Sequence, residues 1–345
     1  MKSVCFWTLI VCVCSGIAGA DDFSVYSNFP TTARYNVVGT ALTDGRLLIW
    51  NGGGIFVQER PNRDKFEHYA SGYEGDPAFA ILSPDGHTVL LGAGGYGTDP
   101  YLDKIYRIDA RAVQDYTPDA VAVTIPHFAA TFLTESLVLI DAGAGDWMNS
   151  LLVIHDISGG KSGPVPVVRK PPVKGDTVVY KPGYSAAMTV DKANGIVYVM
   201  DAASLELRSF SVAGLIQAYT THTTLNWTSD GTLIGSPGAY FNGGVSGITQ
   251  AGLLVIGGAF GWGLEGGVQL VDPATGGIQQ TLDPIGNHAY TSVIYNDVTD
   301  RITVMSQGLT YLQGDVARVP AAGFLGLLTL AGFAGTIIAR RARKL

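Results

Sequence analysis

A strand–turn–strand pattern recurs along the chain and constrains its fold more than any other feature. In each copy an apolar strand precedes a turn and a second strand rich in Leu, Val and Ile. Asp44-Gly45 and Asp85-Gly86 are hairpin dipeptides of the type that adopts positive φ. The turns recur every 41 to 59 residues, the length of a four-stranded propeller blade with variable loops. The copies begin near Asn36, Pro77, Phe128, Tyr184, Gly244 and Tyr290.

This pattern predicts an all-β fold, a β-propeller of about six four-stranded blades over residues 21–317, and the body resembles β-propeller repeat proteins. An internal duplication supports the prediction. The segment IYRIDARAVQDYT, which ends at Thr117, aligns with LRSFSVAGLIQAYT, which ends at Thr220, and the offset of 103 residues equals two blades. An open array of β-sandwiches is the alternative architecture.

The last copy of the pattern lacks a fourth strand. Residues 23–29, FSVYSNF, form an isolated strand pattern near the start of the chain. We expect this strand to complete the last blade, because closing the ring removes sheet edges that would otherwise be exposed.

Residues 1–20 have the three parts of a secretory signal peptide. Lys2 precedes an apolar run, and Ala18-Gly19-Ala20 supplies a small-residue cleavage site with Ala18 and Ala20 at its recognition positions. A buried first helix is the alternative. All three cysteines lie in this segment, so cleavage after Ala20 leaves a mature chain without cysteine.

Residues 318–345 are expected to form a transmembrane anchor with a basic cytoplasmic tail. The segment 321–339 contains 19 uncharged residues, long enough as a helix to cross about 28 Å of hydrocarbon. Arg340, Arg341, Arg343 and Lys344 follow it directly. Because positive residues stay on the cytoplasmic side, the body is expected outside the cytoplasm, in the cell envelope or at the surface.

Val319-Pro320, the Gly-, Leu- and Ala-rich segment and the Arg340-Arg341 cluster together resemble PEP-CTERM sorting signals. The resemblance covers about 27 residues and implies an exosortase as partner, with sorting of a secreted or surface protein. The sequence departs from the motif at one place: the usual motif has Pro-Glu-Pro, whereas this chain has Val319-Pro320-Ala321-Ala322. A plain single-pass anchor is the alternative.

The charge of the body argues against nucleic acid as a partner. Without Lys2 and the four basic residues of the tail, 17 basic residues remain against 29 acidic ones, a formal charge of about −12. Duplex binding depends on clustered Lys and Arg that neutralise phosphates. The segment from Ser158 to Gly183 is locally basic and rich in proline. It is interpreted as a long solvated loop between blades or as a contact surface for an anionic partner.

The start of each blade's first strand supplies the candidate binding residues, because the innermost strands of a propeller line its central channel. Counting back from the turns gives Arg34, Asp76, His127, Tyr184, Asn242 and His288. Of these, Asp76, His127 and His288 form a candidate set of ligands for a divalent cation such as calcium, with Asn242 as a further donor. The alternative is that these polar side chains face a wet channel.

Other residue classes offer weaker candidates. The Gly-rich stretches at 51–54, 92–97 and 257–263 do not open helices with a phosphate-binding signature. Asp99, Asp141 and Asp146 lie near Gly-rich turns but form no calcium-loop motif. Several aromatic residues either fill the core or stack on sugar rings: Trp50, Trp147, Trp227, Trp262, Tyr96, Tyr101 and Tyr240.

The sequence favours an exported, non-enzymatic binding protein for extracellular matrix, a polysaccharide or another protein. No catalytic residue can be named from it. The competing hypothesis is a propeller hydrolase or lactonase with a divalent metal ion in its channel.

Overall fold

The computed structural model describes residues 23–25, 37–71, 77–93, 104–111, 119–122, 127–143, 150–158, 177–181, 187–201, 204–237, 241–259, 266–282, 290–306 and 313–316. The predicted signal peptide, cleavage site and anchor lie outside these ranges. In the part of the chain that is described, no helix has the length and apolar character needed to cross a membrane.

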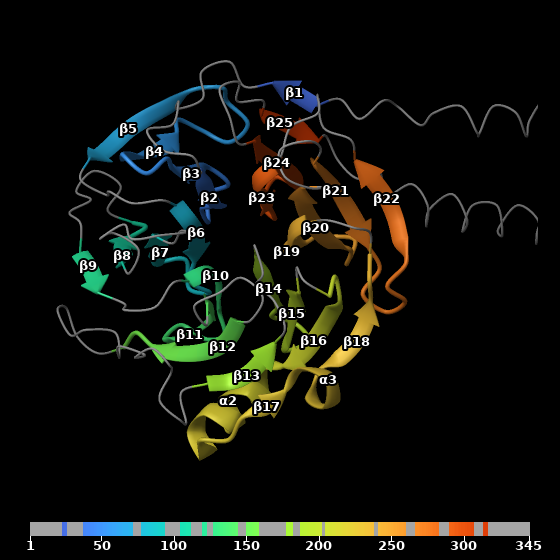
Figure 1. Ribbon diagram of the computed structural model, residues 1–345. Coiled ribbons are helices and arrows are strands. Elements are labelled where there is room, and N and C mark those ends of the chain that lie inside the picture. Colours follow the sequence, from blue (N-terminus) through green and yellow to red (C-terminus); the bar gives the residue numbers. More distant parts are fainter. Residues whose placement is uncertain are drawn as a thin grey trace, which may run out of the picture.

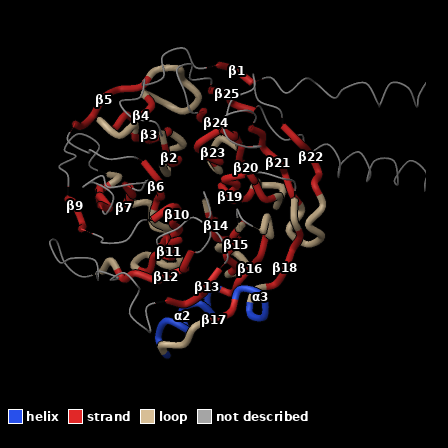
Figure 2. Tube along the Cα trace, in the orientation of Figure 1, coloured by secondary structure: helices blue, strands red, loops and turns tan. Residues whose placement is uncertain are grey.

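The described strands form six sheets around a central opening, arranged as the blades of a propeller (Figure 1). Within each blade, neighbouring strands that follow one another in the chain pair antiparallel, and the first strand is innermost. The innermost strands also contact one another around the ring. The prediction of an all-β propeller is therefore confirmed, and almost every regular element is a strand (Figure 2).

The first, second and fifth blades each contain four consecutive strands. The first has β2 (Val38–Ala41), β3 (Leu47–Trp50), β4 (Gly54–Gln58) and β5 (Phe66–Ser71). The second has β6 (Pro77–Leu82), β7 (Thr88–Ala93), β8 (Lys104–Asp109) and β9 (Asp119–Ala122). The fifth has β19 (Phe241–Ile248), β20 (Leu254–Ala259), β21 (Gly266–Val271) and β22 (Ile278–Leu282).

An insertion links the third and fourth blades. The third blade has β10 (His127–Phe132), β11 (Leu137–Gly143), β12 (Ser150–Asp156) and β13 (Thr177–Lys181). The fourth has β14 (Met188–Asp191), β15 (Ile196–Met200), β16 (Leu207–Ser211) and β18 (Thr232–Gly235). Between its last two strands lie α2 (Val212–Thr221), β17 (Leu225–Asn226) and α3 (Trp227–Asp230). Strand β17 pairs parallel with β13, so the third blade has five strands instead of the predicted four.

Local chemistry fixes this insertion. The Ser211 side chain accepts a hydrogen bond from the backbone N–H of Gly214 and caps α2. Leu215 of α2 and Trp227 of α3 are buried in the hydrophobic cluster between the third and fourth blades. The buried Arg208 guanidinium donates to the carbonyl oxygens of Thr228 and Gly231, at 3.1 and 2.9 Å. The insertion therefore seals the outer part of one seam of the ring.

The sixth blade contains strands from both ends of the body. It has β23 (Tyr290–Asn296), β24 (Arg301–Ser306) and β25 (Gln313–Val316), and its outermost strand is β1 (Phe23–Val25). Strand β1 pairs antiparallel with β25, with Phe23 opposite Val316. The predicted closing strand is confirmed, although its described part ends at Val25.

The seams between blades explain why β3, the second strand of the first blade, is apolar along its whole length. All four residues of β3 are buried. Leu48 and Trp50 join the cluster shared with the second blade, whereas Ile49 joins the cluster shared with the sixth. Each face of a blade thus packs against a neighbour, which turns an alternating pattern into a continuous apolar run.

The hairpin prediction is confirmed at both Asp-Gly turns. Gly45 and Gly86 have φ values of 82° and 74°, in the region that favours glycine. At Gly86 a second constraint acts, because a Cβ atom there would overlap the side chain of Thr43 on the neighbouring hairpin. The turn residues therefore also allow adjacent blades to approach closely.

The structure also bears on the internal duplication and on the segment from Ser158 to Gly183. At the offset of 103 residues, the start of β8 at Lys104 aligns with the start of β16 at Leu207, and both are third strands two blades apart, as the duplication predicts. The interpretation of Ser158 to Gly183 as a long solvated loop is wrong in part, because β13 lies within it. Its pairing with β12 and β17 supplies the hydrogen bonds that a local sequence pattern does not reveal.

Candidate functional site

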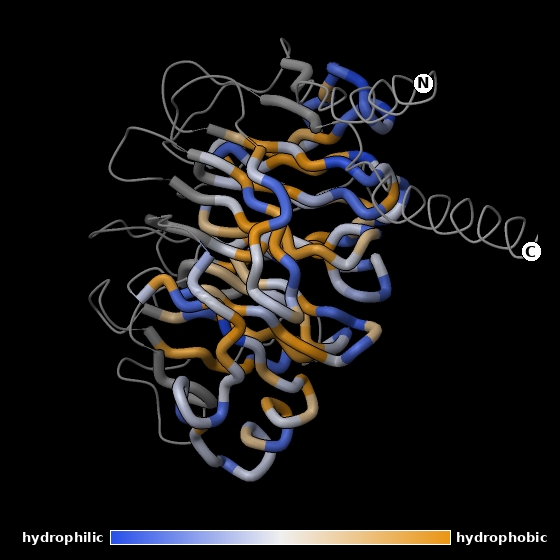
Figure 3. The backbone as a smooth tube through the Cα atoms, turned by 90° about the vertical axis from the view of Figure 1, so that its right-hand side faces the viewer, coloured by the Kyte–Doolittle hydropathy of each residue, from blue (hydrophilic) through white to orange (hydrophobic). Residues whose placement is uncertain are grey.

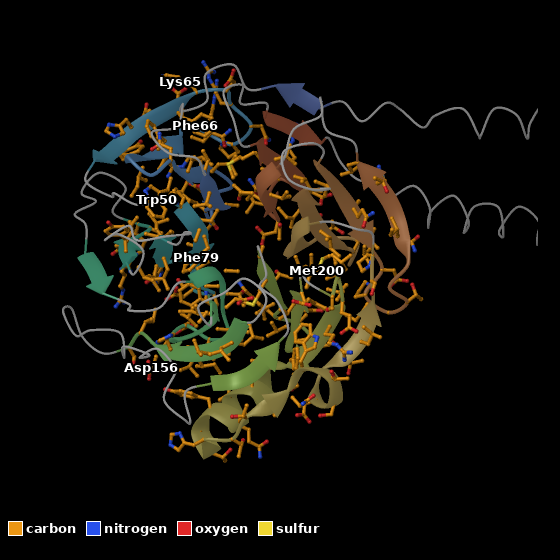
Figure 4. The ribbon with its side chains drawn as sticks, viewed as in Figure 1. Trp50, Lys65, Phe66, Phe79, Asp156 and Met200 are labelled. Carbon is orange, nitrogen blue, oxygen red and sulfur yellow. The ribbon has the colours of Figure 1, made fainter. Side chains whose placement is uncertain are left out.

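A cavity of about 430 Å³ lies at the centre of the ring. The innermost strand of every blade contributes to its wall: β2, β6, β10, β14, β19 and β23. Figure 4 shows Phe79 of β6 nearer to this opening than Trp50, which lies within the blade wall. The cavity volume falls in the range of about 300–1,000 Å³ typical of small-molecule sites.

In the described part of the chain, the cavity wall consists mainly of small and aliphatic side chains. Most of its side chains are Gly, Ala or larger aliphatic residues. Each innermost strand is the last strand of its sheet, so its second edge carries backbone donors and acceptors that its own sheet does not pair. The wall also includes six serine and threonine side chains, those of Thr40, Ser83, Thr131, Thr189, Ser246 and Ser292. This lining suits hydrogen bonding to a polar, uncharged group.

The charged residues of the wall belong to turns at one end of the innermost strands. Asp191 ends β14, Lys192 follows it, and Asp297 follows β23. The Asp191 carboxylate accepts hydrogen bonds from the backbone N–H and the side-chain amide of Asn194, at 3.0 and 2.7 Å. These bonds hold the carboxylate in its own turn.

A hydrogen-bonded network joins the hairpins at this end of the cavity. The Tyr295 hydroxyl donates to Asp300 Oδ1 at 2.7 Å and accepts from the backbone N–H of Gln250 at 2.9 Å. Gln250 Nε2 donates to the carbonyl oxygen of Asp297 at 2.9 Å, which links the fifth blade to the sixth. Burial, followed by the hydrogen bond to Asp300, raises the pKa of Tyr295. Its phenol therefore remains protonated near neutral pH and acts as a structural donor.

The structure places two of the six sequence-predicted channel residues. His127 begins β10 and Asn242 lies near the start of β19, both on innermost strands. Their side chains, and the whole of Arg34, Asp76, Tyr184 and His288, fall outside what the structure describes. The described residues therefore do not test whether the predicted metal ligands lie close together. Among the described residues, no group of three metal-ligating side chains gathers.

Two of the aromatic candidates and one acidic candidate belong to the core. Trp50 and Trp227 are 0% and 4% exposed, so these two indoles fill seams and do not offer a stacking face. Asp141 is fully buried on β11. The other members of both sets, at positions 96, 99, 101, 146, 147, 240 and 262, lie outside the described ranges.

Sequence reasoning missed the charged end of the cavity. It counted from the start of each first strand and so selected the opposite end from Asp191, Lys192 and Asp297. A usable signal was present, since residues that directly follow an innermost strand border the same channel. Thr40 and Thr131 each lie one residue before the last paired position of β2 and β10, and Thr189 lies two residues before that of β14. A threonine near the end of the innermost strand therefore recurs in these three blades.

Comparisons with known proteins bear on the fold. No protein-family model matches the chain, and no curated protein matches it. The β-propeller domain of Cps50 (Swd1) from Myceliophteria thermophila is similar, with a TM-score of 0.53 and 9% identity, covering 86% of this chain and 100% of that one. A Bacteroides thetaiotaomicron protein of unknown function gives 0.53 and 10% identity, covering 86% and 72%.

A chain in the crystal structure of a nidogen/laminin complex is also similar. Its TM-score is 0.50 at 12% identity, and the match covers 72% of this chain and 80% of that one. At such low identity these likenesses concern the fold alone. Together with the ring of sheets, they show that this chain is a β-propeller.

Proposed function

We propose that the chain is an exported, membrane-tethered propeller that binds an extracellular polysaccharide or protein without catalysing a reaction. The central cavity is the observation that carries this proposal. Among the described residues, its wall offers strand-edge backbone groups and six serine and threonine hydroxyls, and the charged side chains lie at one end. Such a surface complements the hydroxyl groups of a sugar better than it complements an ion.

The ends of the sequence supply the location. Residues 1–20 direct export, and residues 321–339 with their basic tail hold the body at the outer side of the membrane. In the sorted form, an exosortase acts after Val319-Pro320. The mass of the mature protein tests this step, because a chain that retains residues beyond Pro320 is anchored and not cleaved.

Substitution of a cavity hydroxyl is expected to weaken binding. Thr189→Val removes one hydroxyl from the wall with little change in shape, and we expect an affinity two- to tenfold lower, since one hydrogen bond contributes about 0.5–1.5 kcal/mol. Binding of the purified chain to a panel of neutral and acidic polysaccharides measures the effect. Thr232→Val, on the exposed outer strand of the same blade, is the matched control. Equal affinities for the two variants would place binding outside the cavity.

A metal-dependent hydrolase or lactonase is the second candidate function. It is favoured by His127 at the start of β10, since that strand lines the cavity. Elemental analysis of the purified protein separates the two functions. A stoichiometric divalent ion that is lost in Asp76→Ala or His288→Ala supports the enzyme, and its absence from the unmodified protein removes the motive for it.

A further inference from the structure

The hairpins that join the first and second strands of the blades share one face of the ring, here termed the hairpin face. Asn296 Nδ2 in the sixth blade donates to the carbonyl oxygen of Gly45 in the first, at 2.7 Å. Gln250 reaches Asp297 in the next hairpin, and Gly86 lies against Thr43. Seen edge-on in Figure 3, hydrophilic turns gather along one side of the ring and hydrophobic segments run through its middle.

The register of the sixth blade places one end of each closing strand at this face. Val316, the last residue of β25, is opposite Ile302, which lies next to the hairpin at 297–300. Gln313, at the other end of β25, is opposite Met305. Strand β1 begins with Phe23 opposite Val316. Both the start of β1 and the end of β25 therefore lie at the hairpin end of this blade.

The short connection to the hydrophobic segment limits where the ring can sit. Five residue steps separate Val316 from Ala321, which span at most about 18 Å when fully extended. The seven residues of β23 alone cover about 23 Å between the hairpin face and the opposite face. A bilayer that contains residues 321–339 is therefore closer to the hairpin face than to the opposite one.

The surface beside this attachment point suits lipid headgroups. The turn between β4 and β5 carries Arg60, Arg63 and Lys65, and Glu59 pairs with the last two at 3.3 Å. Phe66, next to this turn, packs against the cluster that includes residues of the sixth blade. In the sixth-blade hairpin itself, Val298 is 51% exposed. Arg and Lys side chains donate charge-assisted hydrogen bonds to headgroup phosphates, and an exposed aliphatic side chain suits the interfacial region.

We infer that the hairpin face at the sixth and first blades lies against the outer surface of the bilayer. The opposite face then points away from it and is the face that a large extracellular partner reaches. This inference rests on the proposed membrane tethering and deepens it. It also assigns the charged end of the cavity to the membrane side, and the starts of β10 and β19, with His127 and Asn242, to the accessible side.

Site-specific fluorescence quenching tests this orientation. Cys5, Cys12 and Cys14 are the cysteines of the chain, so a full chain with all three replaced by serine accepts single labelling sites. Val298→Cys reports on the hairpin face of the sixth blade. Ser204→Cys, which is exposed in the connection between β15 and β16, reports on the opposite face. Ala251→Cys and Ser236→Cys, also exposed, form a second pair.

The labelled chains are reconstituted in phosphatidylcholine vesicles that contain a lipid with a nitroxide on its headgroup. We expect at least threefold stronger quenching at positions 298 and 251 than at 204 and 236, because collisional quenching requires close approach to the headgroups. Vesicle flotation is measured on the same samples. A chain that floats but shows equal or reversed quenching overturns the orientation alone. A chain that does not float overturns the tethering, and the orientation with it.

Discussion

Removal of β1 is expected to lower the midpoint of thermal unfolding by about 5–10 °C. Strand β1 contributes three paired residues to the edge of the sixth blade. Its loss removes ladder hydrogen bonds worth about 1 kcal/mol each and exposes the edge of β25, which is then free to pair with another chain. For a domain of this size each kcal/mol corresponds to roughly 2–4 °C. Far-ultraviolet circular dichroism of a body that begins at residue 26 measures the shift.

The matched control is a body that begins at residue 21, which keeps β1 and lacks the same leader. A peptide of residues 21–29 added in trans is expected to restore part of the midpoint, because it supplies the missing strand to an unchanged β25. Equal midpoints for the two bodies would contradict a stabilising role for ring closure. Failure of the peptide alone would show that covalent connection supplies much of the effect.

The blade architecture could be predicted because its determinants are local. Asp-Gly dipeptides specify tight hairpins, and a second strand such as β3 is apolar throughout because both faces of its blade are covered. The closing strand was also predictable, since the last blade lacked a fourth strand and FSVYSNF had no other partner in the pattern. Ring closure follows from the general cost of an exposed edge.

The insertion in the fourth blade was missed, although part of it has a local signal. Ser211 is a good helix cap, and Leu215 and Ala218 lie three residues apart on the buried face of α2. The alignment with an earlier strand segment hid this helical period. Strand β13 had no comparable signal, because its identity depends on pairing with β12 and with β17, which is 46 residues further along the chain.

The candidate channel residues stay a prediction. Counting back from the turns gave His127 and Asn242, which the structure places on the innermost strands β10 and β19. Counting did not reveal that turn residues such as Asp191 also border the cavity. The alternation of side chains along a strand identifies its two faces, but it does not indicate where charged residues lie along the channel. Hairpin contacts between blades, such as Asn296 to Gly45, join residues from the two ends of the body.

Trp50→Ala is expected to lower the free energy of unfolding by about 3–5 kcal/mol. Trp50 is fully buried at the seam between the first and second blades. Its indole meets the Tyr106 ring edge-to-face, with centroids 5.8 Å apart and planes at 82°. Truncation to alanine loses this contact and leaves a cavity that the neighbouring strands, fixed by their hydrogen bonds, fill only in part.

Urea denaturation with linear extrapolation measures the loss at Trp50, provided that the slope stays unchanged. Trp50→Phe keeps an aromatic ring at the seam and is expected to cost less than half as much. Leu233→Ala, at a side chain 52% exposed on β18, is the surface control and should change the free energy by about 0.5 kcal/mol or less. In a closed ring every blade packs against two neighbours, so each blade depends on both of its seams. A defect at one seam should therefore lower the free energy of unfolding of the whole ring. A biphasic transition in Trp50→Ala, with the other blades unfolding at the original urea concentration, would contradict this coupling.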